Sequence, residues 1–251
     1  MLKKLFVIMI VALLSFGVLF ADTTDTASGI TEDEMPETLV EKFSYALGVL
    51  CAYNFGADYA MDYFYYYQYY TFPEADEYFA FMGVYDAYYD QLIFSFEELD
   101  EFLNTYSAEY EARVLAIAEE NLKTAEVFLA ANASRNGVVT TESGLQYKVI
   151  SQGDGPRATG TDSVELDYEL KLIDGTILDS SYERGEHETF PMDSVIEGFR
   201  EGVMLMPMGS HYIFYIHPSL GYGETMTSHM EPNSLLIFNV ETYSIVDSTE
   251  V

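Results

Sequence analysis

The sequence is poor in cysteine and has no tryptophan. Cys51 is the single cysteine among 251 residues, so no disulfide can form within the chain. A lone cysteine can still bridge two subunits, but Cys51 lies among apolar residues at helical spacing. We therefore interpret Cys51 as a small buried apolar side chain, in preference to an intersubunit disulfide.

Basic residues are also scarce. The chain has 11 Lys and Arg against 42 Asp and Glu, for a formal net charge of −31. Nucleic acids and anionic membrane surfaces attract clustered Lys and Arg, so we exclude both as expected partners. Acidity of this extent keeps a protein dispersed, and it suits a protein that handles aggregation-prone material.

The sequence lacks the motifs of hydrolytic, metal-dependent and phosphate-binding proteins. Its 4 histidines show neither HExxH nor His-x-His spacing, which argues against a metal site. Ser180-Ser181 lacks the context of a nucleophile elbow, and we find no phosphate-binding loop. We therefore expect no metal and no cofactor.

The N-terminus carries a predicted export signal. Lys3 and Lys4 precede an uncharged, mostly apolar run over residues 5–20, and Ala21 then gives way to a polar tract. This order is typical of a cleaved signal peptide over residues 1–21. A retained anchor helix is the alternative, although the run is short for a membrane span. We expect a periplasmic or secreted chain, with no membrane span after cleavage and no cysteine positioned for a lipid anchor.

Residues 22–136 are predicted to form a helical domain. Thr31 and Glu34 fit a capping box. Apolar residues at helical spacing follow this box: Leu39, Val40, Phe43, Leu47, Leu50 and Cys51. Pro73 could open a second helix. Ser95 and Glu98 form another capping box, before a long helix that is predicted to end at Asn136-Gly137.

A tyrosine band, residues 59–70 with the sequence YAMDYFYYYQYY, lies inside this helical half. Its members Tyr59, Tyr63, Tyr66 and Tyr70 are spaced to line one helical face, and further tyrosines widen the face. Tyrosine has an apolar body and a polar tip, so the band suits a core, a dimer interface or a surface that binds client proteins. We favour a core or dimer interface over a client surface.

Residues 137–251 change to the alternating pattern of strands. Apolar residues alternate over 145–149 and 164–172, and residues 211–217 and 234–245 are dense in β-branched and aromatic residues. Asp174-Gly175 predicts a hairpin turn. One short helix interrupts the strands, with an apolar face that consists of Ile196, Phe199, Val203 and Leu205. The predicted fold class is α+β, with an all-α domain followed by an antiparallel sheet curled around one short helix. The apolar set, with few polar groups in it, indicates an apolar pocket.

Several motifs in this half resemble the FKBP-type peptidyl-prolyl cis-trans isomerases. They cover residues 143–246 in the order and spacing of that family, and they read SGLQYKVI, LIDGTILDSSYERGE, TFPMDSVIEGFREGVMLMPMGS, GYGE and PNSLLIFNVE. The segments FSYALGVL (43–50), MGVYDA (82–87) and GVVTTESGLQYKV (137–149) resemble the Mip-like periplasmic branch, which has an N-terminal helical dimerisation domain.

The resemblance implies a set of site residues. Asp179, Tyr222 and the backbone N–H of Ile196 correspond to catalytic groups, and Arg184 resembles the partner of that aspartate. Phe199 would form the floor of the pocket beneath the proline ring. The remaining substrate-binding positions are Tyr168, Leu178, Phe190, Val195, Met230 and Phe238.

Three positions depart from the family pattern. Phe199 stands where tryptophan is common, and Leu178 stands where phenylalanine usually precedes the aspartate. The flap, residues 224–234, is shorter than usual, lacks its glycine and has Met230-Glu231-Pro232 in place of Ile-Pro-Pro. Apolar character persists at Met230, so the sequence still predicts a pocket.

The expected function is prolyl isomerisation and chaperoning of exported proteins, with unfolded or proline-containing segments as partners. The resemblance also implies a homodimer through the N-terminal helices, and macrolide inhibitors as ligands. A binding protein that holds proline-containing unfolded segments with little or no catalysis is the competing hypothesis. Export alone would also allow an adhesin or virulence factor.

Overall fold

The computed structural model describes residues 35–226 and 230–246, and the chain in it divides into two compact units. The first unit is Met1–Val114 and the second is Leu115–Val251. The predicted signal peptide and the predicted capping box at Thr31 and Glu34 lie outside the described residues. Among the residues described, no helix combines the length and the apolar character that crossing a bilayer requires.

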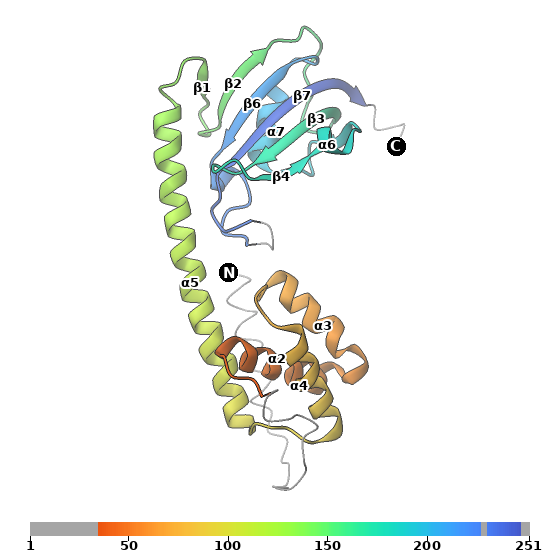
Figure 1. The fold of residues 1–251 in the computed structure, drawn as a ribbon. Helices are drawn as coiled ribbons and strands as arrows, with labels where there is room; N and C mark the ends of the chain where they lie inside the picture. Colours follow the sequence, from red (N-terminus) through yellow and green to blue (C-terminus); the bar gives the residue numbers. More distant parts are fainter. Residues whose placement is uncertain (1–34, 227–229, 247–251) are drawn as a thin grey trace. The chain divides into compact units, whose positions relative to one another are not determined.

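The N-terminal unit is helical, as predicted. It contains α2 (Leu39–Phe55), α3 (Ala57–Tyr70), α4 (Glu77–Tyr89) and the first part of α5 (Phe96–Asn132) (Figure 1). Helix α2 begins after a capping box in which Thr38 and Glu41 exchange side-chain and backbone hydrogen bonds. The predicted box of Ser95 and Glu98 is confirmed at the start of α5.

Two glycines allow α2 and α4 to touch through their backbones. A Cβ atom at Gly48 would lie 2.0 Å from the carbonyl oxygen of Ala80, and one at Gly83 would lie 2.1 Å from that of Tyr45. A buried hydrogen bond of 2.8 Å from the Tyr45 hydroxyl to Asp86 joins the same two helices. Burial raises the pKa of Asp86, and that hydrogen bond opposes the rise.

Two helix boundaries differ from the prediction. Helix α4 begins at Glu77 with Asp76 as its N-cap, because the Asp76 side chain accepts the backbone N–H of Phe79. Pro73 lies in the preceding turn and opens no helix. Helix α5 ends at Asn132, before the predicted Asn136-Gly137.

The tyrosine band lies mostly on the surface of the N-terminal unit. Phe64 and Tyr67 are buried, whereas Tyr59, Tyr63, Tyr65, Tyr66 and Tyr69 are exposed. The side chain of Tyr70 is outside the described part of the structure. The prediction that the whole band packs in the core of this chain is therefore wrong. Cys51, by contrast, is fully buried as predicted.

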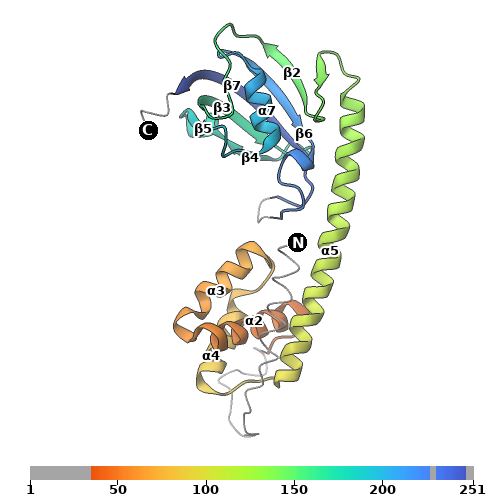
Figure 2. The same ribbon diagram turned by 180° about the vertical axis from the view of Figure 1, so that it is seen from behind.

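The C-terminal unit is an antiparallel sheet with the strand order β1-β2-β6-β7-β3-β4 and β5 paired with β3, which confirms the predicted α+β class. The strands are β1 (Val138–Thr140), β2 (Gln146–Ser151), β3 (Ser163–Lys171), β4 (Ile177–Ser180), β5 (Glu188–Pro191), β6 (His211–Ile216) and β7 (Leu236–Val246). Helix α7 (Glu197–Leu205) is the predicted short helix, and Figure 2 shows it in front of the sheet. A short helix, α6 (Ser181–Arg184), and a 3₁₀ turn, η2 (Pro218–Leu220), complete the unit.

Two glycines also allow α7 to pack closely against the sheet. A Cβ atom at Gly198 would lie 2.6 Å from the Ile216 side chain, and one at Gly202 would lie 2.7 Å from the Phe214 ring. The two glycines are four residues apart, so they share one helical face. Phe199 and Val203, beside them, are buried in the main core of the unit. The close approach of α7 therefore places Phe199 against the sheet.

The opposite face of the sheet is covered by the C-terminal part of α5. Side chains alternate between the two faces of a strand, so Ile213, Tyr215 and Ile237 point away from α7. They pack with Ala125 and Leu129 of α5 in a second, smaller cluster. The sequence predicts a domain boundary between residues 136 and 137, where the helical pattern ends. Packing instead divides the chain between residues 114 and 115, inside α5.

Candidate functional site

Eight of the ten predicted site residues lie in one apolar cluster beneath the sheet. Tyr168, Phe199, Met230 and Phe238 are buried members of it. Leu178, Phe190, Val195 and Ile196 are half-buried and pack against it. These residues come from β3, β4, β5, β7, the start of α7 and the segment before β7, so only the folded sheet brings them together.

Four aromatic rings form the centre of this cluster. The centroid of the Phe199 ring lies 4.9 Å from that of Phe238 and 6.0 Å from that of Phe190. The Tyr168 ring packs on the edge of Phe190, at 5.5 Å between centroids and 73° between planes. Tilted and edge-on contacts of this kind are favourable for aromatic rings. We refer to Tyr168, Phe190, Phe199 and Phe238 as the ring cluster.

Asp179 is held beside the ring cluster by two donors. The Tyr168 hydroxyl donates to one carboxylate oxygen of Asp179, and the Arg184 guanidinium donates to the other. Arg184 also donates to the Tyr168 hydroxyl, over 3.2 Å, and its guanidinium lies 5.7 Å from the centroid of the Tyr168 ring. The predicted pairing of Arg184 with Asp179 is therefore present in the structure.

These contacts keep Asp179 ionised. Partial burial would raise the pKa of Asp179, but the hydrogen bonds from Tyr168 and Arg184 outweigh it and lower the pKa below its ordinary value of 3.8. Burial, together with the hydrogen bond to Asp179, raises the pKa of Tyr168 to about 12. At neutral pH the site therefore has a neutral phenol and a charged carboxylate.

The backbone N–H of Ile196 is a second polar feature. Ile196 is the N-cap of α7, with φ −61° and ψ 149°, so its N–H precedes the helical hydrogen bonds. Its carbonyl accepts the N–H of Arg200. Within the described part of the chain, no acceptor binds the Ile196 N–H. This donor is available at the edge of the cluster that contains the Ile196 side chain.

Tyr222 is the one predicted site residue that the structure does not join to the others. It follows η2, the residue is 46% exposed, and it is not a member of the apolar cluster. The predicted role of its hydroxyl remains a prediction. Its loop is tied to the segment before β7, because the backbone N–H of Asn233 donates to the carbonyl of Gly223 over 2.7 Å.

A polar network around Asp167 of β3 was not predicted from the sequence. Asp167 is buried and accepts hydrogen bonds from Ser181, from the Tyr243 hydroxyl and from His187. Ser181 also accepts the backbone N–H of Tyr168, over 2.9 Å. The network thus ties β3 to the turn that holds Arg184. In a chain with 42 acidic residues, no sequence signal distinguishes Asp167 from the others.

Few polar groups lie among the apolar side chains of the site. Within residues 35–226 and 230–246, no group of three or more His, Cys, Asp or Glu side chains is placed to hold a metal ion. What the site provides is a cluster of packed aromatic rings, one ionised carboxylate and one available amide donor. Such a set can bind a small apolar group and orient the dipoles next to it.

Comparison with family models identifies both halves of the chain. The model of the FKBP-type peptidyl-prolyl cis-trans isomerase domain matches residues 155–243. The model of the domain amino-terminal to that isomerase matches residues 40–149. Together these matches confirm the resemblance on which the predicted site rests.

Individual proteins agree with the family models. The chain is 42% identical to FkpA of Aeromonas hydrophila over 65% of this chain and 62% of that protein. It is 36% identical to the outer membrane protein MIP of Legionella longbeachae over 62% of this chain and 69% of that protein. The crystal structure of FkpA from Escherichia coli superposes with a TM-score of 0.56, at 32% identity, over 68% of this chain and 82% of that one. The match spans less than two thirds of the Aeromonas protein.

Proposed function

Because the chain belongs to the FKBP-type peptidyl-prolyl cis-trans isomerase family, we propose that it catalyses cis-trans isomerisation of X-Pro peptide bonds at the ring cluster. The observation that carries this proposal is the enclosure of Phe199 by Phe190 and Phe238, with Asp179 ionised beside them. A proline ring is apolar and rigid, so it suits a surface of aromatic rings.

The barrier to be lowered is that of amide rotation. Resonance gives the C–N bond a rotation barrier of about 18–20 kcal/mol, and the twisted amide has lost that resonance. Twisting also removes charge separation between nitrogen and oxygen, so a dry environment favours the twisted amide relative to the planar one. Enclosure of the proline ring over Phe199, which is buried, would supply that environment.

The polar groups orient the amide during the twist. Asp179 presents a fixed negative charge to the carbonyl carbon, and Tyr168 and Arg184 hold that charge in place. The available N–H of Ile196 binds a carbonyl oxygen of the substrate backbone, and the exposed Tyr222 hydroxyl binds another. Val195, Leu178 and Met230 complete the apolar walls.

The test is the rate of cis-trans exchange of a short proline peptide, measured by NMR with the full mature chain at catalytic concentration. Phe199→Ala is expected to lower kcat/KM at least tenfold. Ile245→Ala is the matched control, because Ile245 packs on the same core but lies outside the predicted site. A wild-type chain that leaves the exchange rate unchanged would overturn the proposed function.

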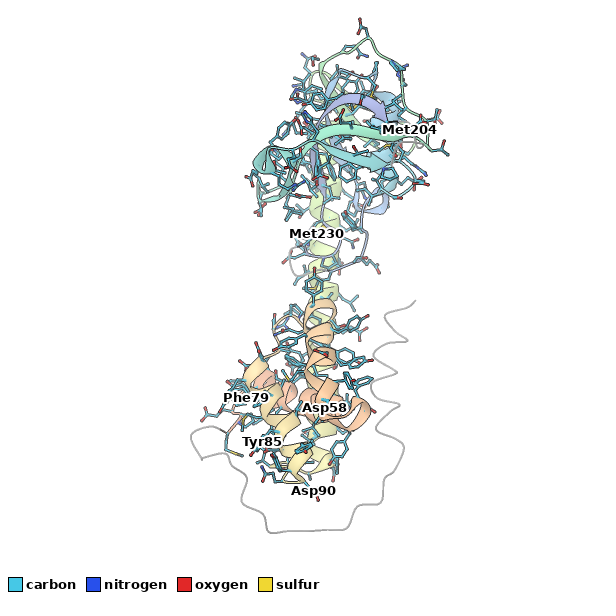
Figure 3. All side chains as sticks on the ribbon, turned by 90° about the vertical axis from the view of Figure 1, so that its right-hand side faces the viewer. Asp58, Phe79, Tyr85, Asp90, Met204 and Met230 are labelled. Carbon is cyan, nitrogen blue, oxygen red and sulfur yellow. The ribbon has the colours of Figure 1, made fainter. Side chains whose placement is uncertain are left out.

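We further propose that the N-terminal unit forms a homodimer and holds unfolded, proline-containing segments of exported proteins. The supporting observation is the exposure of aromatic side chains on two adjoining helices. Tyr59 and Tyr66 of α3 are exposed, as are Tyr85 and Tyr88 of α4, with Tyr85 labelled in Figure 3. Exposed apolar surface of this kind marks a protein–protein contact. The predicted export signal supports a periplasmic or secreted location for this function.

A further inference from the structure

Helix α5 is anchored to the sheet at its C-terminal end. The Asn132 side chain donates to the Gln146 side chain of β2 over 2.9 Å, and Gln146 donates in turn to the carbonyl of Leu129 over 2.9 Å. All three groups are buried, and Ala125 packs with Leu129 one turn earlier. Residues 115–132 of α5 are therefore a fixed part of the C-terminal unit.

The same face of α5 reaches the segment that leads into β7. The Asn121 side-chain amide donates to the carboxylate of Glu231 and to the carbonyl of Pro232, each over 3.0 Å. In the opposite direction, the Asn233 side-chain amide donates to the carbonyl of Ala118 over 3.1 Å. Two side-chain amides thus join one turn of the helix to three consecutive residues, and Ala118 is buried at this contact.

This segment carries one wall of the candidate site. Met230, labelled in Figure 3, immediately precedes Glu231 and is buried in the cluster that contains the ring cluster. Asn233 adopts φ +54°, in the left-handed region, and its N–H donates to Gly223 beside Tyr222. A displacement of residues 231–233 would therefore also displace Met230 on one side and the loop that contains Tyr222 on the other.

We propose that Asn121 and Asn233 act as a clamp through which helix α5 sets the position of Met230 in the substrate site. In this proposal Asn121 and Asn233 are positioning residues, and the helix that starts in the N-terminal unit forms part of the support of the isomerase site. The flap of this chain lacks the usual glycine and the Ile-Pro-Pro sequence, so an external support is consistent with its altered composition. The proposal rests on the proposed isomerase function for its kinetic consequence only.

The test uses the full chain with ¹³C-methyl-labelled methionine. Asn121→Ala removes two hydrogen bonds of the clamp. Asn233→Gly removes the third and keeps a residue that tolerates positive φ. Each variant is expected to move the Met230 methyl resonance and to raise KM for a proline peptide threefold or more, while kcat stays within twofold. Such a split indicates loss of binding that is equal in ground and transition states.

Glu120→Ala is the matched control, because Glu120 is exposed on the same turn of α5 and is not part of the clamp. The control is expected to leave both the resonance and KM unchanged. Unchanged Met230 resonance or unchanged KM in a folded Asn121→Ala chain would overturn the clamp. If the wild-type chain shows no activity, the proposed function fails, but the methyl resonance of the two variants still decides whether the clamp exists.

Discussion

The aromatic residues to which we assign a function are arranged in opposite ways in the two units of this chain. In the C-terminal unit, the rings of Phe190 and Phe238 both pack against the buried ring of Phe199. In the N-terminal unit, several tyrosine rings of α3 and α4 are exposed, among them Tyr59 at 62% and Tyr88 at 67%. An enclosed set of rings suits one small apolar group, whereas exposed rings offer area to a large partner. The arrangement of the rings, more than their number, therefore separates the two proposed roles.

The largest expected effects come from adding one methyl group where a helix touches its neighbour. Gly48→Ala would place Cβ 2.0 Å from a backbone oxygen of Ala80, so the two helix backbones must separate. We expect a loss of about 3 kcal/mol in the unfolding free energy of the N-terminal unit. Gly202→Ala meets the side chain of Phe214, which can shift, so we expect a smaller loss of about 1–2 kcal/mol in the C-terminal unit.

Calorimetry of the full chain can follow both units in one experiment. Gly160→Ala is the control, because no atom lies within 4 Å of the added methyl group. We expect Gly48→Ala to leave peptide turnover intact and Gly202→Ala to lower it. If Gly48→Ala abolished peptide turnover, the two units would not be as independent as their separate cores suggest.

The next effect concerns the carboxylate at the site. Asp179→Ala is expected to lower kcat/KM for a proline peptide at least tenfold, which corresponds to about 1.4 kcal/mol of barrier. The side chain is 42% exposed, so its removal should leave the fold intact, as judged by circular dichroism. Full activity in a folded Asp179→Ala chain would remove Asp179 from the mechanism, even if Phe199→Ala lowered kcat/KM as expected.

A smaller effect is expected in the pH dependence. The pKa of Asp179 is below 3.8 in the folded chain, so the wild-type rate should be constant through neutral pH and fall only in strong acid. Arg184→Ala removes a donor that lowers this pKa. The acid limb of kcat/KM is then expected to move to higher pH, as measured by NMR exchange, which needs no coupling protease. An acid limb that does not move would show that Asp179 is not the group that titrates.

Several elements of the fold could be predicted directly from the sequence, because the spacing of apolar residues indicates which side chains are buried. Alternation over residues 164–172 predicted β3, and the spacing of Phe199 and Val203 predicted α7. Family motifs then located the ring cluster and the pairing of Asp179 with Arg184. These features depend on local spacing or on motifs, both of which are visible in one chain.

Other features depend on contacts between distant residues, which one sequence does not reveal. Asn121 reaches Pro232 across 111 positions, and nothing in the residues around Asn121 marks it as a hydrogen-bond donor to that segment. The start of α4 differs from the prediction because Asp76 caps the helix by accepting the N–H of Phe79, whereas Pro73 lies in the preceding turn. Exposure of the tyrosine band was not evident either, since tyrosine at helical spacing suits a core equally well.

One ratio tests the comparison of the two units most directly. It is the catalysed refolding rate of a protein whose folding is limited by proline isomerisation, divided by the catalysed exchange rate of a proline peptide. Holding a client raises its effective concentration at the site without changing the chemical step. Replacement of Tyr59, Tyr66, Tyr85 and Tyr88 by Ser in the full chain is therefore expected to lower this ratio at least tenfold, with peptide exchange unchanged. Val127→Ser, a change at an exposed apolar residue of α5, should leave the ratio as in wild type. Light scattering on the same samples reports whether the proposed dimer forms in the wild-type chain and is lost in the variant. A ratio unchanged by the four substitutions would contradict the division of roles between enclosed and exposed rings.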